Sequence, residues 1–317
     1  MNSLRSEKTH PFRYFFEKAR HMYIRTRWAG GRTMFATFDK LPPPQGGALR
    51  RITRSLRDKI KPPKPDIQKI EVCGSFFFDV RAYWKDGRLL PAHERSLLTG
   101  RRGALMTRGL TLPQGFRPAV SEQQVARLRA EILCNTLLRA LQRSALPLYC
   151  RRVGLIDPEC LYPFLLEKLI KYCPVVLVCT ERPERYAPYA AQILEEYGAP
   201  ITFVGEPLAL GSCVALLDLG ETPLPSFYPS PVFSARTEPV AHNLSLILPH
   251  YGLPEADEVI PPGIDRDEFY TALWQLCGVE AVSGLYASSM LCKSRRVTVP
   301  QIAAQLSQNQ EQVRILE

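Results

Sequence analysis

The residues that could bind a ligand or do chemistry stand at the ends of four short apolar segments. Asp157 ends the first segment, Thr180 ends the second and Asp218 ends the last. In a parallel sheet, ligands bind beyond the carboxyl ends of the strands, so we expect these side chains to line one edge of a sheet. The candidate ligand-binding residues of this rim are Asp157, Thr180, Glu181, Arg182, Arg185, Glu206 and Asp218.

These residue types fit two kinds of ligand site. Clustered carboxylates raise one another's pKa unless a cation lies between them, so the rim acids could bind a metal ion or a cationic ligand. Thr180, Arg182 and Arg185 could instead surround the 2′-phosphate of an NADP-like nucleotide. The simpler alternative is that the acids cap helices and face solvent, and that Thr180 or Glu181 starts the next helix.

The turn after the first apolar segment lacks the glycines of a dinucleotide site. Such a site needs a G-x-G-x-x-G run, which lets backbone amides approach the pyrophosphate. Here Gly154 lies within the segment, no further glycine occurs before Gly198, and the turn reads Asp157-Pro158-Glu159. The proline removes an amide and the carboxylates repel phosphate. We therefore predict that this turn does not bind NAD in the usual way, and the cofactor stays unknown.

No nucleophile or metal motif is evident in the sequence. The chain has no G-x-S-x-G, no G-x-x-x-x-G-K and no H-x-x-x-H spacing. His242 and His250 follow the last apolar segment, so either could reach the rim and serve as a base; the alternative is an ordinary surface or structural histidine. Catalytic residues stay unassigned, and the sequence favours a protein that is not an enzyme.

The four apolar segments are expected to be strands of a parallel sheet, because buried parallel strands have this short, apolar character. They cover residues 152–157, 175–180, 201–205 and 213–218. Helix-like segments alternate with them. One runs from Asp157-Pro158 to Tyr172, and another from Tyr186 to Tyr197, with Gly198 at its end. This alternation predicts an α/β fold with a Rossmann-like parallel sheet.

The sequence before this sheet predicts a small N-terminal α+β region. Residues 67–90 alternate in hydrophobicity and predict an antiparallel hairpin with turn chemistry at Asp86-Gly87. Residues 91–118 are rich in glycine, proline and arginine and predict loop. Ser121 then begins a helix that ends near Ser144.

Two further elements are predicted beyond Gly220. Residues 244–248 form a possible strand, and Asp265 caps a helix over residues 266–277. The predicted domains are a basic arm and linker at 1–66, a hairpin-plus-helix region at 67–146, a Rossmann-like α/β domain at 147–292 and a C-terminal helical segment at 293–317.

The positive charge of the chain is concentrated in its N-terminal fifth. Residues 1–65 carry 16 Lys and Arg against 4 acids, whereas the whole chain has a net charge of +10. Such a segment attracts polyanions such as nucleic acid or an anionic membrane surface, or docks on a protein partner; the alternative is a solvated tail. Residues 10–28 within it predict a basic amphipathic helix that either docks outward or packs inward. The candidate polyanion-binding residues are Arg50, Arg51, Arg54 and Arg57.

Cysteine usage and hydropathy indicate the compartment. The 9 cysteines are odd in number and form no C-x-x-C pair, which is typical of a reducing cytoplasm. No secretory signal is evident, and no window reaches about 18 uninterrupted apolar residues. We expect a cytoplasmic protein without a transmembrane segment.

The C-terminal sequence resembles part of a helix-turn-helix motif. Residues 297–306 contain an Ile-Ala-x-x-Leu pattern, and residues 310–316 would supply a second helix with buried valine and leucine. In helix-turn-helix proteins the second helix enters the major groove, so the resemblance implies nucleic-acid binding. Glu311 and Glu317 are unfavourable beside phosphates, and the alternative is an amphipathic helix pair that packs on the sheet.

Three functional hypotheses follow. The first is a non-catalytic binding or regulatory module that lacks the dinucleotide fingerprint and docks through its basic arm. The second is an enzyme with an atypical nucleotide or metal site at the strand ends. The third is a nucleic-acid-binding protein that uses the arm together with the helix-turn-helix-like C-terminus.

Overall fold

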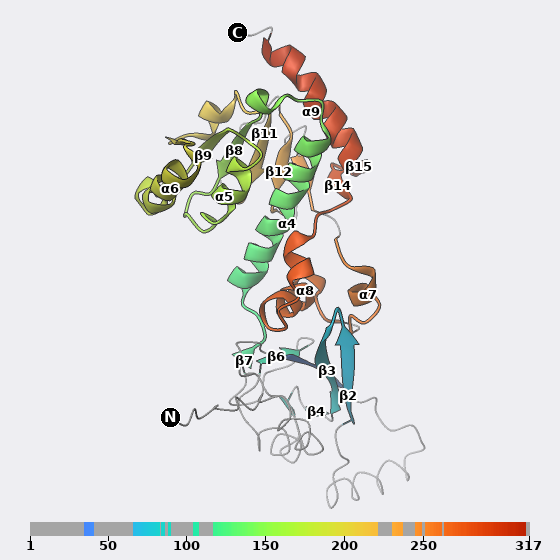
Figure 1. Ribbon diagram of the computed structural model, residues 1–317. Helices are drawn as coiled ribbons and strands as arrows, with labels where there is room; N and C mark the ends of the chain where they lie inside the picture. The colour runs from blue at the N-terminus through green and yellow to red at the C-terminus, as the bar shows by residue number, and fades with distance from the viewer. Residues whose placement is uncertain are drawn as a thin grey trace, which may run out of the picture. The chain divides into compact units, whose positions relative to one another are not determined.

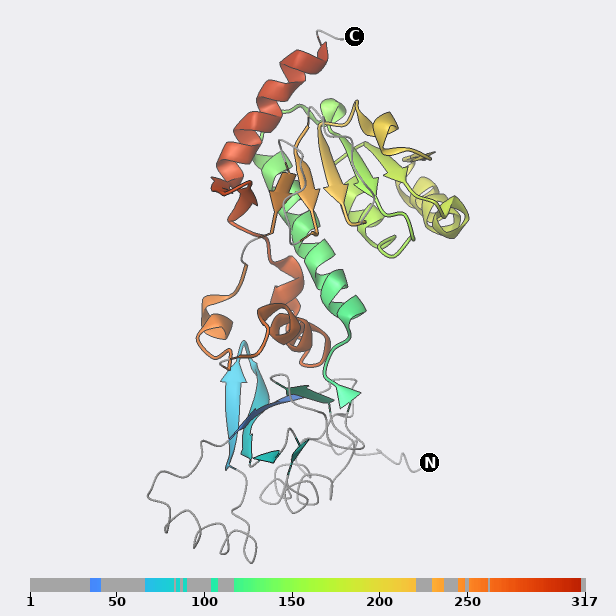
Figure 2. The same cartoon turned by 180° about the vertical axis from the view of Figure 1, so that it is seen from behind.

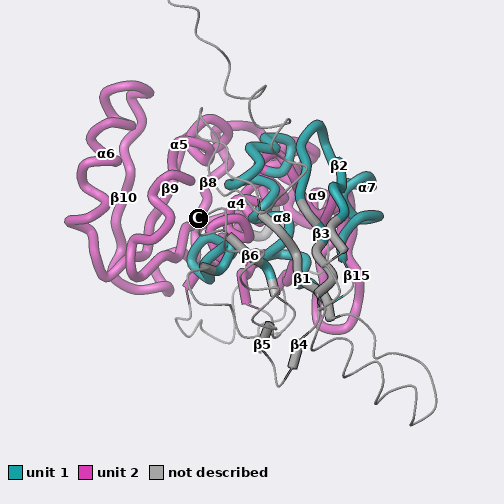
Figure 3. The backbone as a smooth tube through the Cα atoms, turned by 90° about the horizontal axis from the view of Figure 1, so that it is seen from below, with its two compact units in different colours: residues 1–125, 253–282 teal, residues 126–252, 283–317 magenta. Residues whose placement is uncertain are grey.

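A computed structural model describes residues 35–40, 66–82, 84–85, 88–89, 104–107, 117–220, 230–236, 245–248, 251–261 and 263–314 (Figure 1). The chain divides into two compact units, which Figure 3 distinguishes by colour. Unit 1 comprises residues 1–125 and 253–282, and unit 2 comprises residues 126–252 and 283–317. The predicted helix at 10–28, the arginines at 50, 51, 54 and 57, and both His242 and His250 lie outside the described residues.

Unit 2 contains an eight-stranded sheet in the order β10-β9-β8-β11-β12-β13-β14-β15. Its strands are β8 Arg152–Ile156, β9 Val175–Cys179, β10 Ile201–Val204, β11 Ala215–Asp218, β12 Val232–Ser234, β13 Ser245–Ile247, β14 Ser289–Cys292 and β15 Arg295–Thr298. The pairings from β10 to β13 are all parallel, and β14 and β15 are added antiparallel. The prediction of an α/β fold with a mostly parallel sheet is confirmed.

The strand order has one point where the chain changes direction along the sheet. From β8 the chain proceeds outward to β9 and β10, and it then returns to place β11 on the other side of β8. This order, 3-2-1-4-5-6 over the parallel strands, is that of doubly wound nucleotide-binding folds. The switch point therefore lies between β8 and β11, where Asp218 pairs in register with Ile156.

Within its described residues, four α-helices belong wholly or mainly to unit 2: α4 Glu122–Arg143, α5 Leu165–Ile170, α6 Pro183–Tyr197 and α9 Val299–Arg314. The predicted start of α4 is confirmed, because the Gln124 amide donates to the Ser121 hydroxyl at 3.3 Å. The predicted end of α6 is confirmed at Gly198, which has the left-handed φ of 64°. Figures 1 and 2, drawn from opposite sides, show α5 and the unit 2 part of α4 on one face of the sheet.

The predicted helix from Asp157-Pro158 to Tyr172 is wrong in its first half. The α5 helix begins only at Leu165, and a turn occupies the preceding residues. Pro163 has no amide to donate, which disfavours a helix that started at Pro158 and ran through it. Cys160 adopts a left-handed φ of 55°, which no residue within a right-handed helix has.

The resemblance to a helix-turn-helix motif is not confirmed by the fold. Residues 295–298 form strand β15, which pairs antiparallel with β14. Residues 299–314 then form the single uninterrupted helix α9, with no turn between two helices. Ile302, Ala303 and Leu306 are buried. The Ile-Ala-x-x-Leu pattern therefore corresponds to the apolar face of one packed helix, because amphipathic helices in general have this spacing.

The core of the sheet explains the glycine inside the first strand. A Cβ atom at Gly154 of β8 would lie 2.6 Å from Leu216 of β11 and 3.2 Å from Leu210, which belongs to the 3-10 helix η3 (Pro207–Leu210). Leu210 and Leu216 share a buried cluster with Ile156 and Val232. Gly154 therefore serves close packing of η3 on the strands rather than the approach of a ligand.

Unit 1 contains a five-stranded sheet, in the order β2-β3-β1-β6-β7, and a separate β4–β5 pair. Its strands are β1 Phe35–Lys40, β2 Asp66–Val72, β3 Ser75–Ala82, β4 Trp84–Lys85, β5 Arg88–Leu89, β6 Ala104–Thr107 and β7 Arg117–Pro118. An antiparallel hairpin is present in β2 and β3, but it turns at Cys73-Gly74, with φ values of 49° and 71°, instead of at the predicted Asp86-Gly87. The short antiparallel pair β4–β5 flanks residues 86–87.

The sheet of unit 1 is not purely antiparallel, and the prediction of loop for residues 91–118 is wrong in part. Strand β1 pairs in parallel with both β3 and β6, and β6 and β7 lie in the stretch 91–118, where loop was predicted. An interior strand such as β3 pairs with one strand on each edge. Its second partner, β1, comes from a distant segment, and the local sequence does not reveal that pairing.

Two helices of unit 1 follow residue 253. They are α7 Pro254–Asp257 and α8 Arg266–Gln275. The predicted cap is confirmed, because Asp265 accepts a hydrogen bond of 3.1 Å from the Glu268 amide. Phe269 of α8 packs edge-on against Phe77 of β3, with ring centroids 5.2 Å apart. This contact joins α8 to the hairpin within unit 1.

Candidate functional site

Asp157 stands at the carboxyl end of β8, beside the switch point, and its side chain is 1% exposed. Its Oδ1 accepts a hydrogen bond of 3.0 Å from the Leu161 amide, and its Oδ2 accepts one of 2.8 Å from the Tyr162 amide. The Tyr186 hydroxyl of α6 donates a third bond, of 2.6 Å, to Oδ2. In a dinucleotide-binding fold, amides of this turn face the pyrophosphate. Here they face the protein's own carboxylate.

The segment after β9 is joined to the same turn. Thr180 donates from its hydroxyl to the Pro158 carbonyl at 3.1 Å and accepts from the Arg182 amide at 3.1 Å. The Glu181 amide also donates to the Pro158 carbonyl, at 3.0 Å. The rim hydroxyl considered for a nucleotide phosphate is thus engaged as both donor and acceptor within the protein.

Both rim arginines contact Glu159 of the same turn. Arg182 Nε lies 3.7 Å from Glu159 Oε2, and Arg185 Nη1 donates to the Glu159 carbonyl at 3.4 Å. The side chains of Arg182 and Glu159 are 45% and 53% exposed, so solvent screens this ion pair. The loops after β8 and β9 therefore bind to one another along the rim.

Asp218 ends β11 on the other side of the switch point and is completely buried. Burial raises the pKa of its carboxyl to about 6, and the nearby Arg236 guanidinium opposes the rise. Ser234 of β12 donates to Oδ2 at 3.2 Å, the Gly220 amide donates to Oδ1 at 3.3 Å, and Arg236 Nε lies 3.3 Å from Oδ2. These contacts fix the ends of β11 and β12 relative to each other.

Glu206 lies exposed at the end of β10, just before η3. Burial raises the pKa of the Cys179 thiol, and the charges of Glu181 and Glu206 raise it further. Of the predicted rim residues, Asp157 and the residues from Thr180 to Arg185 therefore lie together at the carboxyl ends of β8 and β9. Glu206 lies near the end of β9. Asp218 forms a separate group with Ser234 and Arg236.

A pocket that nothing in the sequence indicated lies away from this edge. It has a volume of about 400 Å³ and lies between α4, α5 and the segment after the 3-10 helix η4 (Glu280–Gly284). We call it the α4–α5 pocket. Residues that line it include Asn135, Arg139, Lys168, Lys171, Tyr172 and Tyr286. The arginines of α4 were recognisable as a polar face, but nothing in the sequence placed them beside Lys168.

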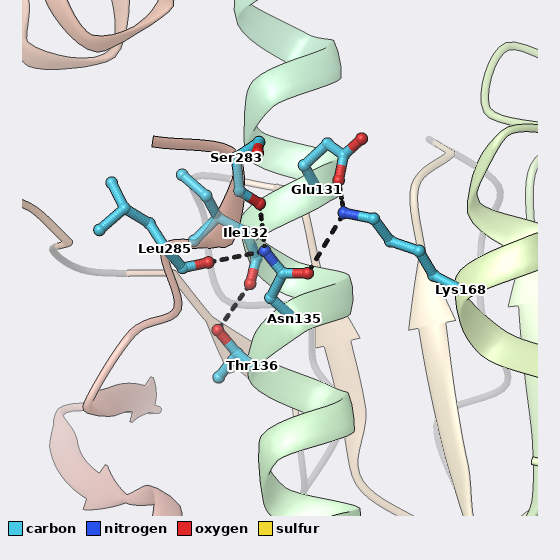
Figure 4. A network of polar contacts seen from close by, with 7 residues as sticks. All are labelled: Glu131, Ile132, Asn135, Thr136, Lys168, Ser283 and Leu285. Carbon is cyan, nitrogen blue, oxygen red and sulfur yellow. Dashed lines mark hydrogen bonds and ion pairs between the residues drawn. The ribbon is translucent and has the colours of Figure 1, made fainter. Parts of the chain in front are cut away.

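A network of polar contacts forms one side of this pocket (Figure 4). Lys168 of α5 pairs with the buried carboxylate of Glu131 on α4, and its Nζ also lies 3.4 Å from Asn135 Oδ1. Asn135 Nδ2 donates to the carbonyls of Ser283 and Leu285 at 2.7 and 2.8 Å. These bonds fasten the segment after η4 to α4.

Comparisons with protein-family models, with curated proteins and with solved structures find no match to this chain. Among the described residues, no group of three or more His, Cys, Asp or Glu side chains could hold a metal ion. The described helices include none that is long and apolar enough to cross a membrane. All nine cysteines lie in the described part of the chain, and none of them forms a disulfide bond there.

Proposed function

We propose that this protein is a non-catalytic binding or regulatory module whose Rossmann-like sheet carries an internal anion at the position of a nucleotide phosphate. The observation that supports it best is the Asp157 carboxylate on the amides of Leu161 and Tyr162. Those bonds use two amides of the turn, and a second anion beside a buried carboxylate would be repelled.

The remaining rim residues support the same reading through their partners. Thr180, Arg182 and Arg185 bond to residues 158 and 159, so an NADP-like phosphate would have to break these contacts to be held there. Asp218 is buried and bonded to neighbours on β12 and beyond. An edge in which polar groups satisfy one another is typical of a structural role.

The binding partner in this proposal is recognised by the basic N-terminal segment. Residues 1–65 hold four times as many basic as acidic side chains, 16 against 4. A charge density of this kind attracts nucleic acid, an anionic surface or an acidic protein.

The edge can be tested by chemical rescue. Replacing the anion with Asp157→Ala should destabilise the protein, and formate or phosphate should restore part of the lost stability by binding to the freed amides. The matched control is Asp218→Ala, in which the removed carboxylate is held mainly by side chains and rescue should be weaker. Equal rescue of both variants would contradict the internal-anion role of Asp157.

A nucleotide screen tests the alternative of an enzyme with a site at the rim. Melting temperatures measured with NAD, NADP and ATP should show no stabilisation that depends on the rim, because Thr180, Arg182 and Arg185 already contact residues 158 and 159. A rise of several degrees that disappears in Thr180→Val or Arg185→Ala would establish a nucleotide site there and overturn the proposal.

The partner can be sought by affinity capture with two chains, one complete and one lacking residues 1–65. The proposal expects a partner that only the complete chain retains. If that partner is nucleic acid, its affinity should fall steeply with salt. Retention of every partner by the shortened chain would show that the basic segment is not the docking element.

A further inference from the structure

The α4–α5 pocket is positively charged along its walls. Arg139 comes from α4, and Lys168 and Lys171 come from α5 and the residue after it, whereas none of the described residues that line the pocket is acidic. The two lysines pair with acids outside the lining, Lys168 with Glu131 and Lys171 with Glu167. The charge that remains for a ligand is therefore carried chiefly by Arg139.

Arg139 has unused hydrogen-bonding capacity. Its Nη1 lies 3.5 Å from Gln142 Oε1, at the limit of a hydrogen bond, and its guanidinium lies 5.5 Å from the Tyr286 ring centroid. Within the described residues, its Nε is shielded from solvent and has no hydrogen-bond partner. A guanidinium presents several donors in a planar fork that matches phosphate and carboxylate oxygens. An anion in the pocket would accept hydrogen bonds from the outer Nη atoms of this guanidinium.

The wall opposite α5 is held in place by two neighbouring residues of α4. Asn135 bonds to the carbonyls of Ser283 and Leu285, and the Thr136 hydroxyl accepts from the Ala287 amide at 2.9 Å. Tyr286 lies between these anchors. The pocket is thus formed before any ligand arrives, which reduces the entropy lost on binding.

The size and lining of the pocket indicate a small molecule. A volume of about 400 Å³ falls within the range of small-molecule sites. The Tyr172 and Tyr286 side chains are 38% and 40% exposed and offer aromatic surface for a ring. Lys168 and Lys171 already pair with Glu131 and Glu167, so a ligand must compete with these carboxylates for the lysines. A phosphate monoester carries up to two negative charges and competes better than a monoanion.

We propose that the α4–α5 pocket binds a small phosphate monoester that carries an aromatic ring. Arg139 and Lys171 bind the phosphate, and the ring packs against the tyrosines. This site rests on the proposed binding role of the protein but shares no residue with the rim, so the two proposals can fail separately.

The test is calorimetric titration of the full chain with phenyl phosphate, inorganic phosphate and benzoate at low ionic strength. Phenyl phosphate should bind more tightly than either fragment by about tenfold, because it alone combines the dianion and the ring. Arg139→Gln should weaken its binding by about tenfold or more, and Lys171→Gln by a smaller factor. The matched control Arg143→Gln, on an exposed residue one turn further along α4, should change the affinity by less than about twofold.

Three outcomes would overturn the proposal. The first is that phenyl phosphate binds the wild-type, Arg139→Gln and Lys171→Gln chains with the same affinity. The second is that benzoate binds as tightly as phenyl phosphate. The third is that none of the three probes shows binding in the titration. Circular dichroism of each variant verifies folding, and Lys171→Gln serves as the test if Arg139→Gln does not fold. Nucleotide binding that is lost in Arg139→Gln but kept in Arg185→Ala belongs to this pocket and leaves the proposal for the rim intact.

Discussion

The Tyr186 hydroxyl donates a hydrogen bond of 2.6 Å to Asp157 Oδ2, joining α6 to the turn that follows β8. Tyr186 is completely buried. Burial and then the Asp157 charge raise the pKa of the Tyr186 hydroxyl, so it keeps its proton and remains a donor. The bond therefore links the two elements that enclose the first turn of the Rossmann-like sheet.

Tyr186→Phe should lower the free energy of unfolding by about 1.5–3 kcal/mol, because it removes a hydrogen bond to a buried carboxylate. Denaturant unfolding measures this loss. The control is Tyr189→Phe on the same helix, whose side chain is 44% exposed and whose replacement should cost less than about 0.5 kcal/mol. Similar losses for both variants would show that the bond to Asp157 contributes little.

Asp218 should make stability depend on pH. Its pKa is about 6 in the folded protein, above the ordinary aspartate value of 3.8, so the folded state binds the proton more tightly. The contribution of Asp218 to the free energy of unfolding is therefore greatest below pH 4. It falls by up to about 3 kcal/mol as the pH rises from about 4 to about 6. Asp218→Asn should flatten this part of the profile. The free energy of unfolding is measured across this pH range for both proteins. If its slope against pH is the same in Asp218→Asn as in the wild type, the pH dependence does not come from Asp218.

Gly154→Ala should destabilise unit 2 by about 1–3 kcal/mol, because the new Cβ would overlap Leu216 in a packed core. Gly205→Ala is the matched control, since a Cβ there meets nothing within 4 Å. Leu216→Val removes the clashing Cδ atom, so the double variant should lose less stability than the sum of the single variants. Additive losses would place the cause elsewhere.

Lys168→Met and Lys171→Met compare a buried ion pair with an exposed one. Lys168→Met leaves Glu131, which is 7% exposed at its side chain, without its cation, and should cost about 3–5 kcal/mol. Lys171 pairs with Glu167 at the surface, so its replacement should cost less than about 1 kcal/mol. Thermal or denaturant unfolding gives both values, and a larger loss for Lys171→Met would refute the comparison.

Much of the fold could be predicted because its signals are local. The apolar runs that became β8, β9, β10 and β11 are self-contained, and the ends of α4, α6 and α8 carry their own capping residues at Ser121, Gly198 and Asp265. Strand β12 is only three residues long and was not predicted. The β14–β15 hairpin was also missed, because its sequence continues into the apolar pattern of α9.

The candidate site was less predictable, because a side chain's role depends on its partners. The sequence identified Asp157 as a capping residue at a turn unsuited to phosphate. Its burial and its bond to Tyr186, 29 residues away, depend on how α6 packs on the sheet. The approach of Lys168 to Glu131, 37 residues apart, likewise has no local signal.

The sequence by itself determined the α/β class, the parallel sheet and the absence of a glycine turn after β8, since these follow from apolar spacing and residue type. Only the tertiary structure decided what each polar group of the rim does and where cations gather. Hydrogen bonds and ion pairs act over a few ångströms, and only the packing of α4, α5 and α6 brings distant residues within that range.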